Sequence, residues 1–264
     1  MIIIGEKLNS SVPSVKALMD AKNSGEIIKL ARAQTENGAR FIDINAGMFL
    51  EKEPEMLAWL AGTLAAEGFA LSIDTPSHEA ARAALEAAGT EGNVINSVTT
   101  QKERFENMAA LAAEHRCGVV ALCMQDAGTP ENLESRLSTA DELVSRLTSR
   151  GVSAEDIYID PMLRPLGADE TAGLDALETI SRLSKAYPEC SVICGLSNLS
   201  FGLPKRKIIN RAFAVAAVCN GLNAAILDPL DRDLLGLVSA AEAISGKDEY
   251  CLEYISKCRE GRIG

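Results

Sequence analysis

The sequence predicts a single (β/α)₈ barrel, an α/β fold that spans residues 1–264 as one domain. Three observations favour it. Short apolar runs alternate with longer amphipathic stretches, which is typical of a parallel sheet covered by helices. Eight such units fit into the 264 residues, a usual length for one closed barrel. The Gly-rich motifs GxGxxG and GxxxxGK[ST] of open nucleotide-binding sheets are absent from the sequence.

The predicted strands are short and apolar, as expected for strands that are buried on both faces. They cover residues 2–4, 41–44, 70–73, 94–95, 119–122, 157–159, 192–194 and 224–227. Between them apolar residues recur at helical spacing, as in Leu57, Leu60 and Leu64. Because a barrel strand is parallel to its neighbours, all the strands would end at the same mouth.

Local signals indicate where the helices begin and end. A glycine, which readily adopts the left-handed conformation that ends many helices, follows four helical stretches, at Gly38, Gly68, Gly89 and Gly151. Thr75 before Pro76 predicts one helix start, and Thr139 with Glu142 matches a capping box at another. The polar stretch 123–139 predicts a loop over the barrel mouth, and the residues from about 245 onward predict a short tail.

The charge balance excludes some classes of partner. Twenty-six basic and 37 acidic residues give a net charge of −11, with no basic run, so nucleic acid and anionic membranes are not expected partners. No apolar run approaches the roughly 18 residues of a membrane span. The first residues lack the cationic region of a secretory signal. We therefore expect a cytoplasmic protein.

The residues that usually hold transition metals are sparse. The seven cysteines form no CxxC pair, and most lie in apolar runs, which predicts buried, reduced thiols. A structural zinc site needs closely spaced ligand pairs, and His78 and His115 are the only imidazoles in the sequence. The sequence therefore predicts no metal site of this kind.

Polar side chains follow nearly every predicted strand. Any one of them could simply cap the next helix, because Asp, Asn and Ser are common at that position. Together they predict a polar site at the barrel mouth, where the active sites of this fold are built. The set contains Glu6, Asn9, Asp43, Asn45, Asp74, Asn96, Gln125, Asp160, Ser197, Asn198 and Asp228.

Carboxylates and amides without clustered histidines suit two kinds of ligand. One is Mg²⁺, which prefers oxygen ligands. The other is a neutral heterocycle, because a carboxylate accepts two parallel N–H donors while Asn and Gln donate and accept at once.

Seven segments, taken in order along the chain, resemble the pterin-binding superfamily. Within it they are most similar to the methyltetrahydrofolate:corrinoid (iron-sulfur) protein methyltransferases. The segments are IIGEKLN at 3–9, GARFIDIN at 38–45, ID at 73–74, INS at 95–97, YIDP at 158–161, GLSN at 195–198 and RKIINR at 206–211.

The resemblance implies a role for individual residues. Asp160 would pair with the ring N–H and amino group of a pterin, while Asn96 and Asp74 would bind other edges of the ring. Asn198 would be the catalytic residue, close to the methyl-bearing N5, and Arg206 would lie near the pterin face or the tail. The implied folate-binding set also contains Glu6, Asn9, Asp43, Asn45 and Gln125.

The implied reaction moves a methyl group between N5 of tetrahydrofolate and the cobalt of a corrinoid, in either direction. The corrinoid should arrive on a separate corrinoid protein, because the cobalamin-carrying motif Asp-x-His-x-x-Gly is absent. Pro76 and Ala113 stand where that motif would need Asp, two residues before His78 and His115. The resemblance also implies a homodimer.

Two alternatives stay open. The sister branch, dihydropteroate synthase, carries a basic residue after the serine of its seventh-strand motif, where this sequence has the neutral Asn198. A folate-binding protein without turnover is the other. Phe201 stands where some methyltransferases of the family carry a polar residue, a departure that bears on the surroundings of N5 or of the corrinoid.

Overall fold

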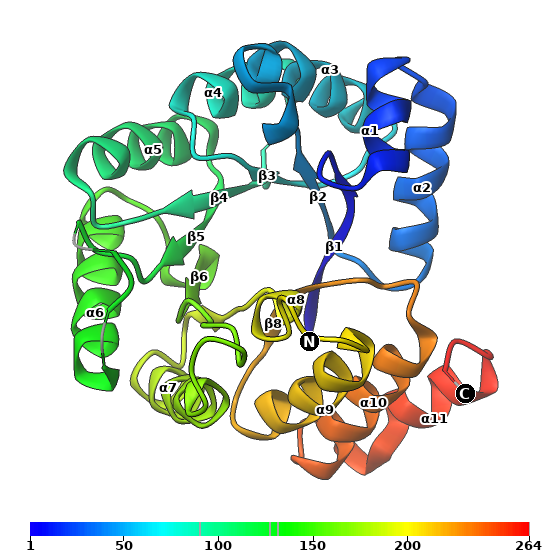
Figure 1. Ribbon diagram of the computed structural model, residues 1–264, viewed down its shortest axis with the longest axis vertical. Coiled ribbons are helices and arrows are strands. Elements are labelled where there is room, and N and C mark those ends of the chain that lie inside the picture. The colour runs from blue at the N-terminus through cyan, green and yellow to red at the C-terminus, as the bar shows by residue number, and fades with distance from the viewer. Residues whose placement is uncertain (90, 127, 131, 264) are drawn as a thin grey trace.

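The computed structural model describes residues 1–89, 91–126, 128–130 and 132–263. Its strands are parallel, lie in the order β7-β6-β5-β4-β3-β2-β1-β8 and are surrounded by a ring of helices (Figure 1). This confirms the predicted (β/α)₈ barrel. The strands are β1 (Ile2–Asn9), β2 (Phe41–Asn45), β3 (Leu71–Asp74), β4 (Val94–Val98), β5 (Gly118–Leu122), β6 (Ile157–Asp160), β7 (Ser191–Val192) and β8 (Ala224–Leu227).

The barrel closes between β7 and β8, although β7 is only two residues long. Ile226 N donates to Cys194 O at 3.0 Å, and Gly195 pairs with Ile226 in a parallel bridge. At the other end of the seam, the side chain of Asn223 accepts a hydrogen bond from Val192 N at 2.7 Å. An asparagine side chain thus completes the pairing that the short strand leaves open.

The helices form the outer layer, and some βα units carry an additional one. The tail packs as α11 against α10, where Lys257 Nζ donates to Ser239 Oγ at 3.0 Å. No helix in the described ranges is long and apolar enough to cross a membrane. The α-helices are α1 (Pro13–Asp20), α2 (Ser24–Glu36), α3 (Glu53–Ala65), α4 (His78–Ala88), α5 (Lys102–His115), α6 (Leu133–Ser149), α7 (Ala172–Ala186), α8 (Leu196–Leu199), α9 (Arg206–Cys219), α10 (Arg232–Ile244) and α11 (Leu252–Arg259), and the 3₁₀ helices are η1 (Gly47–Lys52), η2 (Ala154–Asp156) and η3 (Glu249–Cys251).

The helix ends were predicted better than the helix starts. All four predicted glycines have positive φ, between +60° and +94°. Both predicted caps are wrong. Ser77, not Thr75, caps α4, and its Oγ accepts from Ala80 N at 3.2 Å. The Thr75 hydroxyl lies before the helix, where it accepts from Ser77 N at 3.0 Å and donates to the buried Glu53 carboxylate at 2.7 Å. Asn132 caps α6, so Thr139 lies inside that helix and bonds back to Ser135 O at 2.7 Å.

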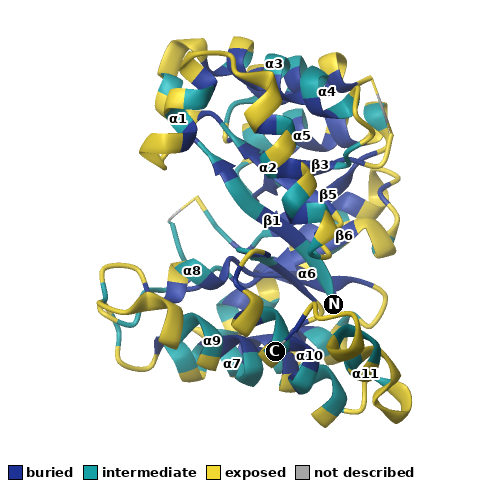
Figure 2. Cartoon of the chain, turned by 90° about the vertical axis from the view of Figure 1, so that its right-hand side faces the viewer, coloured by how far each residue is buried: buried dark blue, intermediate teal, exposed yellow. Residues whose placement is uncertain are grey.

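The strands are mostly buried, with β1 only partly so (Figure 2). One apolar layer lies between the strands and the helices, and a second, separate cluster fills the barrel itself. Inside the barrel Phe41 and Tyr158 meet edge to face, with ring centroids 6.3 Å apart. Side chains alternate along a strand, so the next inward positions toward the mouth are Asp43 on β2 and Asp160 on β6. The apolar cluster is therefore the floor on which the polar residues stand.

A bulge in β1 turns two consecutive charged residues toward the mouth. The register with β2 shifts between Gly5 and Leu8, so that Glu6 and Lys7 have no direct partners there. The buried side chain of Gln34, from α2, holds the bulge because its Oε1 accepts from Lys7 N at 3.0 Å. Gly5 leaves room for this contact, since a Cβ there would lie 2.4 Å from Gln34 Oε1.

Gly5→Ala should therefore lower the free energy of unfolding. The new methyl group must displace Gln34 from Lys7 N, and overpacking of this kind costs about 1–3 kcal/mol. Gly25→Ala is the matched control, because a Cβ there meets only Asn23 Oδ1 at 3.7 Å. Urea unfolding of both variants measures the difference, and equal stabilities would contradict the role of Gln34.

Candidate active site

One side of the mouth is built by β2, β3 and β4. Asp43 is buried, and its Oδ1 accepts from Ser72 Oγ at 2.6 Å and from Asn96 Nδ2 at 3.4 Å. Burial raises the pKa of Asp43 well above its ordinary value, and the neighbouring Asp74 and, more weakly, Glu6 raise it further. The predicted residues Asp43 and Asn96 are thus hydrogen-bonded to each other.

A second pair stands one step nearer to the mouth. Asn45 Nδ2 donates to Asp74 Oδ2 at 3.0 Å, while Asn45 Oδ1 accepts from Gly47 N at 3.1 Å. Burial raises the pKa of Asp74, although the bond from Asn45 opposes the shift. Arg104, which is not one of the predicted site residues, is the cation near Asp74, and it donates to Ser97 O at 3.2 Å.

Asp160 ends β6 on the opposite side of the barrel. It is 7% exposed, and its Oδ1 accepts from Met162 N at 2.7 Å. Its second oxygen receives no hydrogen bond from the described residues. The buried thiols of Cys123 and Cys194 lie near the carboxyl group, and burial raises the pKa of Asp160 to about 7. Within the described ranges, one oxygen of this buried carboxyl group is therefore open to a donor from a ligand.

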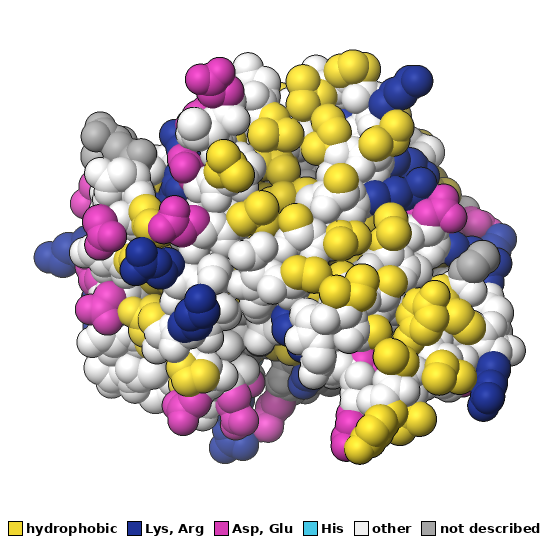
Figure 3. All heavy atoms as spheres, turned by 90° about the horizontal axis from the view of Figure 1, so that it is seen from below, with side chains coloured by type: hydrophobic (Ala, Val, Ile, Leu, Met, Phe, Trp, Pro, Cys, Tyr) yellow, Lys and Arg dark blue, Asp and Glu magenta, His cyan; other side chains and the backbone are white. Residues whose placement is uncertain are grey.

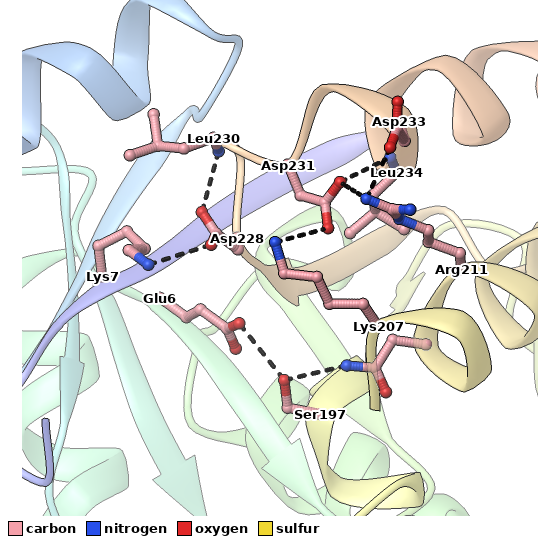
Figure 4. Close-up of polar contacts among 11 residues, drawn as sticks. Glu6, Lys7, Ser197, Lys207, Arg211, Asp228, Leu230, Asp231, Asp233 and Leu234 are labelled. Carbon is pink, nitrogen blue, oxygen red and sulfur yellow. Dashed lines mark hydrogen bonds and ion pairs between the residues drawn. The ribbon is translucent and has the colours of Figure 1, made fainter. Parts of the chain in front are cut away.

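The seam between β7, β8 and β1 supplies charged groups (Figure 4). Lys7 Nζ pairs with Asp228 Oδ2 at 3.0 Å, and Ser197 Oγ donates to Glu6 Oε1 at 3.3 Å. Burial and then Asp228 raise the pKa of Glu6. Ser197 and Asp228 were recognised as strand-end residues, but Lys7 was not. A regular strand would have turned Lys7 outward, and the bulge that prevents this depends on Gln34, far away in the sequence.

Asn198 and Arg206 lie on the same seam. Asn198 is exposed, and its Nδ2 would be 3.1 Å from a Cβ on Gly195, so the side chain folds back over the turn. No described residue forms a hydrogen bond with its amide group. Arg206 donates to Ser197 O at 2.6 Å and to Ser200 Oγ at 3.1 Å. Arg206 thus fixes α8, the short helix that presents Asn198.

Asn9 and Gln125 are not hydrogen-bonded to the other predicted residues. Asn9 Oδ1 accepts from Ser11 N at 2.9 Å in a local turn. Gln125 Nε2 donates to Thr139 Oγ1 at 2.8 Å and to Ser135 Oγ at 3.3 Å, so this amide group is directed at α6. Their roles in ligand binding stay predictions.

The site as a whole favours a ligand that donates hydrogen bonds. Glu6, Asp43, Asp74 and Asp160 each have a raised pKa with burial as the first cause. A further anion would add repulsion, whereas N–H donors would satisfy the buried oxygens. Among the residues that the structure describes, no group of three or more His, Cys, Asp or Glu residues is arranged to hold a metal ion.

Residues 5–228 match the family model described as pterin binding enzyme. The chain belongs to this family. Over its whole length it is 33% identical to a methylcorrinoid:tetrahydrofolate methyltransferase of Eubacterium limosum, and it covers 98% of that protein. This confirms the resemblance to the folate–corrinoid methyltransferases, the branch of pterin binding enzymes to which the chain belongs. It is also 30% identical over 86% of its length to a methionine synthase of Mycobacterium leprae, of which it spans 20%.

Solved structures of pterin binding enzymes share the fold. The chain superposes on dihydropteroate synthase from Xanthomonas albilineans with a TM-score of 0.71 and 20% identity, covering 94% of both chains. For the Vibrio fischeri enzyme the TM-score is 0.71 and the identity 19%, with 93% of both chains covered. At these identities the likeness concerns the fold alone.

The buried Asp160 makes stability depend on pH. Its folded pKa of about 7 exceeds the value of about 4 for an unfolded Asp, so only the unfolded chain releases this proton between those values. The penalty for burying the carboxylate is absent below pH 4, grows as the pH rises to 7 and is constant above it. Asp160→Asn mimics the protonated form and keeps an acceptor for Met162 N.

Relative to wild type, Asp160→Asn should therefore gain stability between pH 4 and pH 8, by an amount on the order of a few kcal/mol. Urea unfolding across this range measures the gain. Asp156→Asn, at the exposed end before β6, is the control and should show no such trend. A difference for Asp160→Asn that is independent of pH would contradict the raised pKa.

Proposed function

We propose that this enzyme moves a methyl group between N5 of tetrahydrofolate and the cobalt of a corrinoid bound to a separate corrinoid protein. One observation carries the proposal: the exposed neutral amide of Asn198 has no hydrogen bond to a described residue, and it follows β7, the strand that pairs with β6, which ends at the buried carboxyl group of Asp160. A condensing enzyme that expels pyrophosphate would be served better by a cation at position 198.

The pterin ring would lie on the polar residues that stand above the apolar floor. Asp160 has one oxygen that accepts from Met162 N and one that is open. Together they would accept from two parallel N–H donors, such as the ring nitrogen and the amino group of a pterin. Asn96 and Asp74 would bind other edges of the ring. A ligand that lacks these donors would leave the carboxyl group unsatisfied, which gives the site its specificity.

Methyl transfer from N5 is difficult because the nitrogen is a poor leaving group. Protonation of N5 as the carbon–nitrogen bond breaks lowers that barrier. Asn198 can favour this transition state through its side-chain oxygen, which would accept a hydrogen bond from N5–H⁺. The nucleophile, cobalt(I), belongs to the corrinoid substrate, so the chain need only align the methyl group between nitrogen and cobalt.

The rim of the mouth supports docking of a corrinoid protein. Exposed apolar side chains lie in the segments that follow four adjacent strands, β7, β8, β1 and β2. They are Val12, Met48, Leu50, Phe201 and Leu230. Apolar patches at a concave site are typical of protein-binding surfaces. Phe201, the departure from the family pattern, would then contact the corrinoid protein.

A second exposed apolar face supports the homodimer that the resemblance implies. Hydrophobic side chains spread over the side of the molecule that carries α9, α10 and α11 (Figure 3). The residues include Ile208, Leu237, Ile244, Leu252 and Ile255. This face lies outside the barrel mouth, so a second copy could bind there while the corrinoid protein occupies the mouth. We also propose that the protein is cytoplasmic and that the methyl group can be transferred in either direction.

The test combines the protein with methyltetrahydrofolate and reduced cobalamin and follows the visible spectrum. Conversion of cob(I)alamin to methylcobalamin is the expected result. No conversion with free cobalamin or with candidate corrinoid proteins would overturn the proposal. Product from a pterin pyrophosphate and p-aminobenzoate would instead assign the condensing reaction.

Asp160→Ala should abolish folate binding, because both acceptors for the pterin N–H donors are lost. Removing the partner of buried hydrogen bonds to a charged group costs about 1.5–3 kcal/mol for each bond. Calorimetric titration with methyltetrahydrofolate measures the loss, and Asp156→Ala is the control at the other end of β6. Retained affinity would place the pterin elsewhere.

Asn198→Ala should slow methyl transfer by more than it weakens folate binding, since the bond to N5–H⁺ exists only in the transition state. A loss of about 10–100-fold in rate corresponds to one such hydrogen bond. Single-turnover rates and folate affinity, measured on the same preparation, separate the two effects. Equal losses would reassign Asn198 to ground-state binding.

A further inference from the structure

Glu6 and Ser197 form a hydrogen-bonded pair at the mouth (Figure 4). Ser197 Oγ donates to Glu6 Oε1 at 3.3 Å and accepts from Asn210 Nδ2 at 3.5 Å. The pair lines a cavity of about 190 Å³. In sequence, Ser197 directly precedes Asn198, and both belong to α8. The pair thus lies on the side of the mouth where N5 is expected.

We propose that Glu6 is the proton reservoir of the methyl transfer and that Ser197 passes the proton between Glu6 and N5 of the folate. The inference rests on the proposed function, because Asn198 itself has no proton to give to N5 without becoming an unstable anion. A separate proton donor is therefore required.

The bonding capacity of Ser197 allows transfer in both directions. A hydroxyl group donates one hydrogen bond and accepts two. When Glu6 is protonated, Ser197 accepts from both Glu6 and Asn210, and its own proton is left for N5. When Glu6 is ionised, Ser197 donates to it, as in the structure, and keeps one lone pair to accept from N5–H.

Protons and electrons balance among N5, Ser197, Glu6 and the cobalt of the corrinoid. As the N5–methyl bond breaks, its electron pair stays on nitrogen and the methyl group bonds to the cobalt(I) of the corrinoid. Ser197 gives its proton to N5 and takes the proton of Glu6, which becomes a carboxylate. In the opposite direction N5 bonds to the methyl group, the cobalt keeps the electron pair of the broken bond, and Glu6 collects the released proton.

The charges around Glu6 favour a carboxyl group that holds its proton. Burial is the first cause that raises the pKa of Glu6, and Asp228 is the second. The bond from Ser197 and the cations Lys7 and Arg206 oppose the shift. Asp43 faces Glu6 from β2 as a further acidic group. Of the other charged residues that line the cavity, Lys207 and Arg211 both form ion pairs with Asp231.

The first test is Glu6→Gln, which keeps an acceptor for Ser197 but has no acidic proton. With methyltetrahydrofolate and cob(I)alamin as the probe pair, the single-turnover rate should fall at least about 100-fold, as for the loss of a general acid. Folate affinity should fall by a much smaller factor than the rate, because Gln keeps the shape of the side chain and one acceptor oxygen. The pH dependence that the Glu6 proton imposes on the rate should disappear. Glu55→Gln, an exposed carboxylate on α3, is the matched control.

Asp228→Asn distinguishes proton supply by Glu6 from a purely structural role of Glu6, because a structural role would leave the pH–rate profile unchanged. Loss of the negative charge removes a cause of the raised pKa of Glu6 and frees Lys7, so both effects lower that pKa. The pH–rate profile should shift to lower pH while transfer continues.

If Glu6→Gln fails to fold, Ser197→Ala replaces it. That variant should also lose about 100-fold in rate, and adding Glu6→Ala should cost little more, because the two residues act as a unit.

The outcomes are distinguishable. A wild-type protein without any transfer overturns the proposed function itself. Wild-type transfer together with an unchanged rate and pH profile in Glu6→Gln overturns only the proton reservoir. Equal losses of rate and folate affinity would also overturn it, because they assign Glu6 to folate binding.

Discussion

The burial of carboxyl groups directly above an apolar floor is the constraint on which the site depends. Asp43 and Asp160 occupy the inward positions that follow Phe41 and Tyr158, and burial is the first cause of the raised pKa of both carboxyl groups. Taking an ionised carboxyl group out of water is costly unless it is paired or hydrogen-bonded. The free protein meets this cost only in part, since one oxygen of Asp160 has no donor among the described residues. A ligand rich in N–H donors would supply the missing bonds, so the cost in the free protein becomes affinity for that ligand.

The mouth divides into two halves with different chemistry. Along β2, β3 and β4 the polar groups bond mainly to one another through Asn45, Asn96 and Ser72, which gives a fixed set of acceptors. Along the seam of β7, β8 and β1 the groups are charged or hydroxylic and come from a bulge and a short helix. The first half suits recognition of a rigid ring. The second half, with exchangeable protons and an exposed amide, suits the reacting nitrogen.

The sequence could predict the strands and most of the mouth because both follow from local pattern and barrel closure. Apolar runs mark the strands, and parallel closure brings their polar ends together wherever the helices begin. Features that depend on distant contacts could not be predicted. The bulge that turns Lys7 to the mouth needs Gln34 from α2, and the direction of Gln125 depends on α6 starting at Leu133 rather than after Thr139. The Thr75 cap was wrong because α4 starts three residues later, at His78, and Ser77 caps it, while Thr75 bonds to Ser77 N and to Glu53 on α3.

The carboxyl groups of the mouth explain why an uncharged side chain at position 198 suits the proposed reaction. In the proposed reaction N5 gains positive character as the methyl group moves, and the surrounding carboxyl groups favour that charge. A lysine or arginine at position 198 would pair with these groups and oppose the charge on N5, whereas an amide leaves the field of the floor intact and still offers an oxygen. The guanidinium of Arg206, a cation on this side of the mouth, is engaged with Ser197 O and Ser200 Oγ. The buried carboxyl groups and the neutral amide are thus two parts of one electrostatic arrangement, which in the proposed reaction would stabilise a protonated N5.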